Sequence, residues 1–271
     1  MVSVKEEIRN FQFWKAVRTE FLITLLLVFV GCGAAVRWSE ASPANDIQVG
    51  LAFGLAVATF VQCVGHISGG HMNPAVTLGM LVTRNVSILR AVFYCAVQCL
   101  GAIAGSAILY GVLPKDIRAD LGTTRVNEQF SLAQAFGVEF MITFIYVFTV
   151  FANLDPKRQD MGSRSLAIGL SVTLGHLFAY SYTGASMNPA RSLGPALIMN
   201  IWENHWLYWV GPMMGGIFGG FTYEYTHDSS NAFQYLRRSF RRKWPTAVQR
   251  SRSTLSTNST EMTMTDDDCR V

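Results

Sequence analysis

The sequence carries the four residues Met-Asn-Pro-Ala twice, in "GGHMNPAVTLGML" and in "TGASMNPARSLGPALI". Proline suits the first position of a helix and the asparagine before it is a preferred N-cap, so each motif predicts a helix start. When the cap oxygen accepts from the helix backbone, the side-chain NH₂ group remains a hydrogen-bond donor. The motif residues, which could therefore present two amide donors, are Asn73, Pro74, Ala75, Asn188, Pro189 and Ala190.

The segment before each asparagine is rich in glycine and other small residues, which let an extended backbone approach a ligand closely. Its carbonyl groups could form a row of acceptors beside the amide donors. Asn-Pro is also an ordinary turn signal, but two copies with matching flanks make that interpretation the weaker one. The residues expected to contribute are Gly69, Gly70, His71, Met72, Gly184, Ser186 and Met187.

Two glutamates hold equivalent places, Glu20 in "TEFLITLLLVF" and Glu139 in "VEFMITFIYVF". A pair of acids could transfer protons as a catalytic dyad. Because the two lie in separate copies of a repeat, we favour a structural role, in which each accepts hydrogen bonds from a loop backbone and braces it. On this interpretation neither glutamate performs chemistry.

Composition places these residues in a membrane. The 271-residue chain is 50% hydrophobic and only 15% charged, which is unusual for a soluble fold. Six stretches of roughly 20 residues are long enough to cross a bilayer as helices. They are about 15–38, 48–68, 88–112, 133–153, 163–181 and 205–225. We therefore predict an all-α, multi-pass integral membrane protein.

The two halves form an internal repeat with three spans each. Because three is odd, the second copy must enter the membrane from the opposite side, which gives an inverted repeat. The apolar runs after the motifs, about 74–82 and 189–199, are too short to span and are predicted as re-entrant half-helices. Irregular backbone at that depth is tolerated only where it is buried in protein or lines a watery cavity. The repeat therefore predicts a pore.

Lysine and arginine set the expected orientation. Most of the 22 lie in the N-terminal segment, the second-to-third and fourth-to-fifth connections and the C-terminal tail. The positive-inside rule then places both termini in the cytoplasm. We divide the chain into an N-terminus at 1–14, a channel domain at 15–225 with repeats at about 15–112 and 133–225, and a tail at 226–271. The net charge of +4 reflects this topology, and no basic groove interleaved with aromatic residues indicates nucleic acid.

The half-helices also have an electrostatic consequence. Each would place about half a positive charge at its N-terminus, so the pore centre would repel cations. A water molecule that accepts from both asparagines could not also donate to its neighbour along the file. The motifs therefore predict a break in any proton wire.

The segments "HMNPAVTLG", "MNPARSLGPA" and "GHLFAYSYTG", together with the two "EF" glutamates, resemble the aquaporins of the major intrinsic protein family over about residues 12–226. The resemblance implies six transmembrane helices with two re-entrant half-helices, and a homotetramer in which each chain has its own pore for water. It also implies an outer constriction and a pore histidine on the cytoplasmic side, His71. The residues of the constriction are Phe53, His176, Ala185 and Arg191.

Within this constriction, Phe53 would form an apolar wall, and we expect His176 and Arg191 to donate hydrogen bonds to passing water. Such a ring leaves room for little else, so we expect a water-selective channel. Ser192 stands where glycerol-conducting relatives typically have aspartate, and Tyr208–Trp209 resembles the aromatic pair of water-selective members. Ala185 replaces the cysteine of other relatives, so mercury inhibition at that site is not expected. Passage of glycerol or hydrogen peroxide is the alternative.

Other classes of protein fit less well. A membrane adhesion or scaffold protein would be favoured by degraded motifs, and an alternating-access transporter by further mid-membrane carboxylates. An enzyme is the least favoured, because no nucleophile–base pair stands out. The five cysteines are odd in number and four lie inside predicted spans, so no disulfide framework, metal or other cofactor is expected.

The tail after about residue 226 differs from the rest of the chain. The basic segment "RRSFRRKW" could bind anionic lipid of the cytoplasmic leaflet, and the following residues have the composition of a disordered region. Three serines beside arginines are candidate sites for a kinase, and we expect the protein in the plasma membrane. The serines are Ser239, Ser251 and Ser253.

Overall fold

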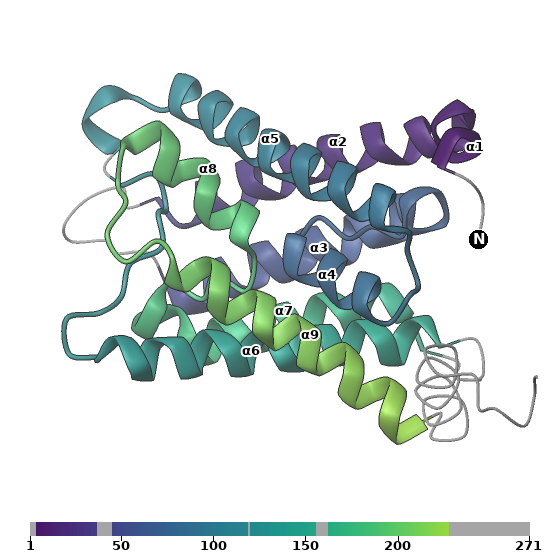
Figure 1. Ribbon diagram of the computed structural model, residues 1–271. Coiled ribbons are helices and arrows are strands. Elements are labelled where there is room, and N and C mark those ends of the chain that lie inside the picture. Colours follow the sequence, from purple (N-terminus) through teal and green to yellow (C-terminus); the bar gives the residue numbers. More distant parts are fainter. Residues whose placement is uncertain (1–3, 37–44, 119, 156–161, 228–271) are drawn as a thin grey trace, which may run out of the picture. The chain divides into compact units, whose positions relative to one another are not determined.

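The computed structural model describes residues 4–36, 45–118, 120–155 and 162–227 (Figure 1). Within these residues the regular structure is entirely helical. The contacts divide the chain into two units, Met1–Tyr223 and Glu224–Val271. The elements are α1 (Val4–Arg9), α2 (Phe11–Ala34), α3 (Asp46–Ser68), α4 (Pro74–Val82), α5 (Ile88–Val112), the 3₁₀ helix η1 (Lys115–Ile117), α6 (Leu132–Leu154), α7 (Arg164–Thr183), α8 (Pro189–Met199) and α9 (Leu207–His227).

The six long helices, α2, α3, α5, α6, α7 and α9, lie where the sequence predicts spans. Four of them, α2, α3, α5 and α6, are both long and apolar enough to cross a membrane. Helices α7 and α9 have 20 and 21 residues, but serine, threonine and histidine dilute the apolar character of α7, and glycine that of α9. Helix α2 begins four residues earlier than predicted, because the Asn10 side chain caps it by accepting from Gln12 N at 2.8 Å.

The two short helices end where the sequence predicts, which confirms the half-helices. Helices α4 and α8 have 9 and 11 residues, or about 14 and 17 Å at 1.5 Å per residue, against about 30 Å for a bilayer core. Figure 1 shows both among the longer helices, and they contact each other. The structure therefore brings the two motifs together inside the bundle.

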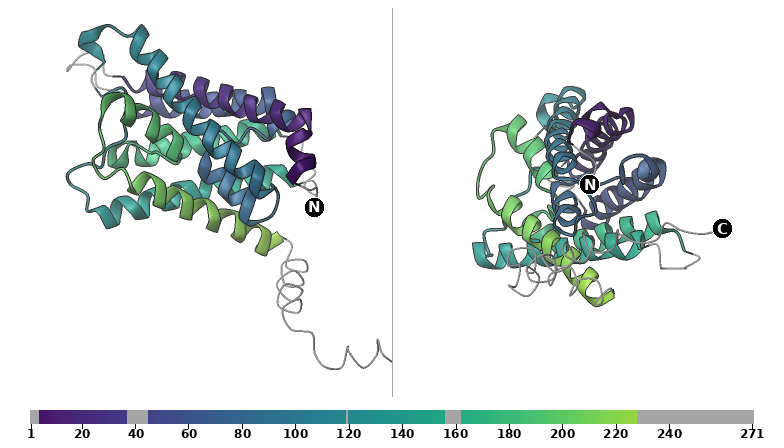
Figure 2. Two further views of the ribbon diagram at one scale, coloured as in Figure 1. Left: turned by 45° about the horizontal axis from the view of Figure 1, so that its top comes forward. Right: turned by 45° about the vertical axis from the view of Figure 1, so that its right-hand side comes forward.

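The inverted repeat is visible in how the helices pack. Gly54 of α3 and Gly169 of α7 each lie nineteen residues before their motif asparagine, and a Cβ on either would overlap the carbonyl of the other. Helix α5 lies beside α2, as the purple and blue ribbons of Figure 2 show. There a Cβ on Gly101 would overlap the carbonyl of Phe21, and one on Gly215 of α9 would overlap that of Phe140 in α6 in the same way. Small residues let membrane helices approach closely, and here they do so at equivalent positions of both halves.

Candidate functional site

The two motif asparagines cap the half-helices. Asn73 Oδ1 accepts from Ala75 N at 2.8 Å, and Asn188 Oδ1 accepts from Ala190 N at 3.0 Å and from Arg191 N at 3.2 Å. Both side chains are buried in the protein. Since each oxygen is fixed by the cap, each amide nitrogen serves as a donor.

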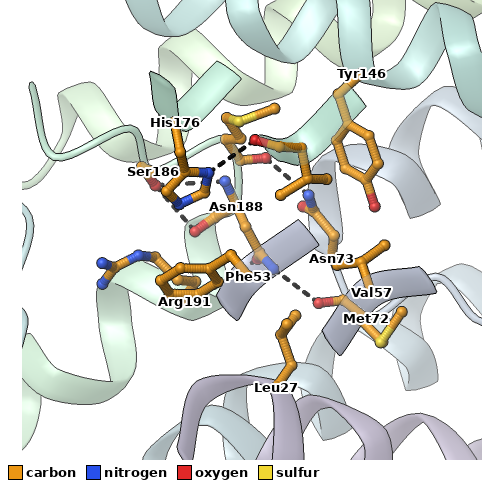
Figure 3. A pocket seen from close by; sticks show the side chains of 12 residues that line it. Leu27, Phe53, Val57, Met72, Asn73, Tyr146, His176, Ser186, Asn188 and Arg191 are labelled. Carbon is orange, nitrogen blue, oxygen red and sulfur yellow. Dashed lines mark hydrogen bonds between the residues drawn. The ribbon is translucent and has the colours of Figure 1, made fainter. Parts of the chain in front are cut away.

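Each amide also donates to the backbone of the other half. Asn73 Nδ2 bonds Met187 O at 2.7 Å, and Asn188 Nδ2 bonds Met72 O at 2.8 Å (Figure 3). Sequence reasoning missed these bonds, because it expected the carbonyls of both methionines to face a solute. An NH₂ group has two hydrogens, so each asparagine keeps one N–H for a ligand while it links the two halves.

The loops before the asparagines have an unusual backbone that turns these carbonyls toward the partner. Met72 and Met187 both have a φ of 53°, and Ala185 has one of 47°. Few residues other than glycine adopt this left-handed region, and strain of this kind persists only where the surroundings impose it. The loops must therefore be held by other contacts.

Glu20 holds the first loop. Its carboxylate accepts from His71 N at 2.9 Å, from Met72 N at 2.8 Å and from Ser68 Oγ at 2.6 Å. Gln98 Nε2 adds a fourth bond at 2.9 Å. Glu20 is fully buried, and its hydrogen bonds join α2 and α5 to the loop.

Glu139 holds the second loop in the equivalent way. It accepts from Ser186 N and Met187 N, both at 2.9 Å, and from Thr183 Oγ1 at 2.6 Å. Each glutamate is thus bonded to the loop of its own half, which argues against a dyad that shares a proton.

Two tyrosines complete the support, and sequence reasoning missed this role for both. Tyr94 OH donates to Ser68 O at 2.9 Å and Tyr208 OH donates to Thr183 O at 2.9 Å. They lie twenty-one and twenty residues after Asn73 and Asn188, so aligning the two repeats would have identified them.

Three residues predicted for the constriction lie together. The rings of Phe53 and His176 stack with centroids 4.6 Å apart, and Arg191 Cζ lies 4.9 Å from the centroid of Phe53. Arg191 Nη1 donates to Gly122 O at 2.7 Å and lies 3.5 Å from Cys32 Sγ. These two contacts of Nη1 therefore hold the guanidinium group of Arg191 in position.

The structure shows which atom of the helix backbone the His176 ring contacts. Its Nδ1 lies 2.9 Å from Val172 O, and because a carbonyl can only accept, Nδ1 carries the hydrogen. In the neutral ring Nε2 is then an acceptor, whereas sequence reasoning expected a donor. Among the described residues, His176 Nε2 and Arg191 Nε are buried polar atoms without a hydrogen-bond partner. Buried polar atoms normally have partners, so a ligand that both accepts and donates would suit this place.

A small cavity connects the constriction to the asparagines (Figure 3). It offers about 20 Å³ to the centre of a water-sized sphere, and a single water needs about 10–15 Å³ by this measure. Besides the asparagines, the constriction residues, Ser186 and the two methionines, its lining consists of Leu27, Val57, Tyr146 and Val172. The cavity therefore suits a molecule of the size of water.

The sequence comparison identifies the family. The profile of the family described as "Major intrinsic protein" matches residues 7–223. The chain belongs to the major intrinsic protein family. This member is 51% identical over 244 residues to "Aquaporin-4" of Bos taurus, a match that covers 89% of this chain and 75% of that protein. It is also 51% identical over 220 residues to "Lens fiber major intrinsic protein" of Lithobates pipiens, covering 81% and 83%.

A solved structure has the same fold. The "aquaglyceroporin from Plasmodium falciparum" superposes with a TM-score of 0.71 and covers 82% of this chain and 99% of that one. The sequences are 22% identical, so the similarity concerns the fold. This family member is therefore a membrane protein with two half-helices inside its bundle.

The remaining predicted residues lie around the cavity without lining it. His71 is buried, and its Nδ1 lies 3.0 Å from Thr77 Oγ1. Gly69 and Gly184 end α3 and α7 with positive φ, Gly70 follows with a φ of 64°, and Ala185 is fully buried. The predicted lipid-binding segment and the three tail serines lie outside the described residues.

Proposed function

We propose that this family member is a passive, water-selective channel driven by osmotic gradients. One observation carries the proposal: a single water-sized cavity is lined by Asn73 and Asn188 together with His176 and Arg191. Water both donates and accepts, so it satisfies all of these groups. Glycerol, with six heavy atoms, is larger than the molecule that this cavity suits.

At the constriction, water would meet one donor and one acceptor. It accepts from the guanidinium group of Arg191 and donates to the imidazole ring of His176, while the ring of Phe53 forms an apolar wall. These opposite requirements orient the molecule and replace the hydrogen bonds that it loses on leaving bulk water. The constriction is therefore favourable for water and unfavourable for an apolar solute of similar size.

At the centre, both asparagines would act on the same water. Their free N–H groups donate to its oxygen, and the N-termini of α4 and α8 add positive potential from both directions. Its two hydrogens then point away from the asparagines, so protons cannot pass by hopping along one continuous chain. Glu20 and Glu139 support this geometry through the loops that they brace.

We further infer the setting of the channel from family membership and charge. The lysine and arginine distribution supports cytoplasmic termini, and the family supports a homotetramer with one pore per chain. Plasma-membrane location, the division at about residues 15 and 225, lipid binding by the basic tail segment and phosphorylation of the tail by a kinase belong to the same proposal.

The test is stopped-flow light scattering on proteoliposomes that contain the purified protein. Vesicles in an impermeant osmolyte should shrink much faster than empty liposomes, and vesicles in glycerol should not re-swell. Re-swelling in glycerol, or shrinkage equal to that of empty liposomes, would refute a water-selective channel. An enclosed peroxide-sensitive dye tests the hydrogen peroxide alternative on the same vesicles.

Mercury then tests the loop that Glu139 braces beside the constriction. Ala185 lies in the loop braced by Glu139 and three residues before Asn188, so we expect mercuric ion to block Ala185→Cys and to leave the wild-type chain open. The wild-type chain is the control. It carries the same exposed cysteine of α3, Cys63, so it shows any effect of mercury that does not depend on Ala185→Cys. Equal block of wild type and variant would place the mercury-sensitive site elsewhere.

A further inference from the structure

Tyr146 of α6 lines the cavity, and the function proposed above gives it no role. The repeat provides a way to judge it, because every pore position of one half has a mate in the other. Val57 and Val172 both lie sixteen residues before their asparagine, and both line the cavity with the same side chain. Leu27 and Tyr146 both lie seven residues after their glutamate, yet one is aliphatic and the other is a phenol.

The same comparison separates the constriction from the rest of the pore. The three constriction residues that line the cavity are aromatic, basic or polar, whereas their mates in the other half are aliphatic. The pairs are Phe53 with Ile168, His176 with Val61 and Arg191 with Val76. Departures from symmetry therefore mark the place where the pore selects, and Tyr146 is a further departure.

The position of Tyr146 supports this reading. Figure 3 shows Tyr146 and Arg191 on opposite sides of the asparagine pair. Tyr146 lies on α6 two turns beyond Glu139, so it is well removed from the loop that Glu139 braces. Its side chain is 4% exposed, and nearly all of its surface is thus packed into the wall.

The hydroxyl group is the polar part of this side chain. It forms no hydrogen bond with any described residue, and it is not among the unpaired atoms that are sealed off from solvent. A buried tyrosine hydroxyl usually finds a partner. In a cavity that fits water, the partner is a water molecule in the pore.

We propose that Tyr146 forms a second constriction, on the far side of the asparagines from Arg191, which limits the rate of water passage. Its ring fills space that the aliphatic mate Leu27 leaves open in the other half, and its hydroxyl group holds one water back by a hydrogen bond. This inference rests on the proposed water channel. On this inference Tyr146 limits the rate of water passage in addition to the outer constriction formed by Phe53, His176 and Arg191.

The test replaces Tyr146 by the residue of its mate. We expect Tyr146→Leu to raise the water permeability per channel about threefold, equivalent to a barrier lower by about 0.65 kcal/mol. Tyr146→Phe removes only the hydroxyl group and should give a smaller rise. A leak through a damaged fold would also admit glycerol, so glycerol entry separates a leak from a faster water pore.

Phe148→Leu is the matched control on the same helix. Phe148 stacks with Phe144 and contacts Tyr223 of α9, so the same change of size occurs away from the cavity. Flux should equal that of wild type after correction for protein per vesicle. Glycerol entry should stay at the level of empty liposomes in the Tyr146 and Phe148 variants, because the outer constriction is unchanged.

The outcomes separate this inference from the function on which it rests. Wild-type vesicles no faster than empty liposomes would refute the channel itself. A conducting wild type with Tyr146→Leu equal or slower would refute the second constriction and leave the channel standing. An equal rise in Phe148→Leu would also refute it, because the effect would then not belong to the cavity.

Discussion

Glu139→Gln tests whether the buried carboxylate holds the pore loop. Glutamine is nearly the same size, but it has one acceptor oxygen instead of two. In its best orientation that oxygen keeps the bonds from Ser186 N and Thr183 Oγ1. The NH₂ group then faces the Met187 N–H that now lies 2.9 Å from Oε2, so a buried donor loses its acceptor.

The size of the effect follows from that one bond. An unpaired buried donor costs about 1–3 kcal/mol, and more when its partner was charged, so we take about 2 kcal/mol. For a chain of this size, this loss lowers the unfolding temperature by about 4–8 °C. Met187 O also accepts from Asn73, so a loosened Met187 should misplace that amide and reduce water permeability about threefold.

The assay is thermal unfolding in detergent, followed by tryptophan fluorescence, with flux measured on proteoliposomes. Glu128→Gln is the control, because Glu128 is exposed and the change removes the same charge without a buried partner. If both variants unfold within about 1 °C of wild type and conduct equally, Glu139 does not brace the loop and the reasoning is wrong.

Two further substitutions probe the filter and the helix packing. Arg191→Val, which installs the residue of its mate Val76, should raise glycerol entry about tenfold by removing bulk and a donor; an unchanged glycerol rate in the same assay would contradict the filter. Gly54→Ala would put a Cβ 2.6 Å from Gly169 O and should cost about 1–3 kcal/mol through overpacking, seen as a lower unfolding temperature. Gly137→Ala, where nothing lies within 4 Å, should not, and an equal change in both would contradict the close contact.

Short-range signals in the sequence were sufficient to predict where most of the helices lie. Asn-Pro fixes where α4 and α8 begin, because an N-cap and a proline at the first position act within one turn. The long helices follow from apolar runs of bilayer length. The start of α2 was missed by four residues, since Asn10 caps a turn that precedes the apolar run.

The contacts of the site depend on atoms far apart in the chain, and the sequence did not reveal them. Asn73 and Met187 are 114 residues apart, and nothing in either motif indicates that the amide of one meets the carbonyl of the other. The donor and acceptor roles of His176 depend on Val172 O, which only the helix geometry supplies. Tyr94 was accessible in principle, through alignment of the repeats, because its place matches that of Tyr208.

The crossed bonds between Asn73, Met187, Asn188 and Met72 also have a consequence for biosynthesis. The first half is made before the second, so its amide and its strained carbonyl at Met72 enter the bilayer without partners. Unpaired polar groups in lipid are costly, and each half is therefore an incomplete insertion product. The crossed bonds at the centre of the bundle can therefore form only once the second repeat is present.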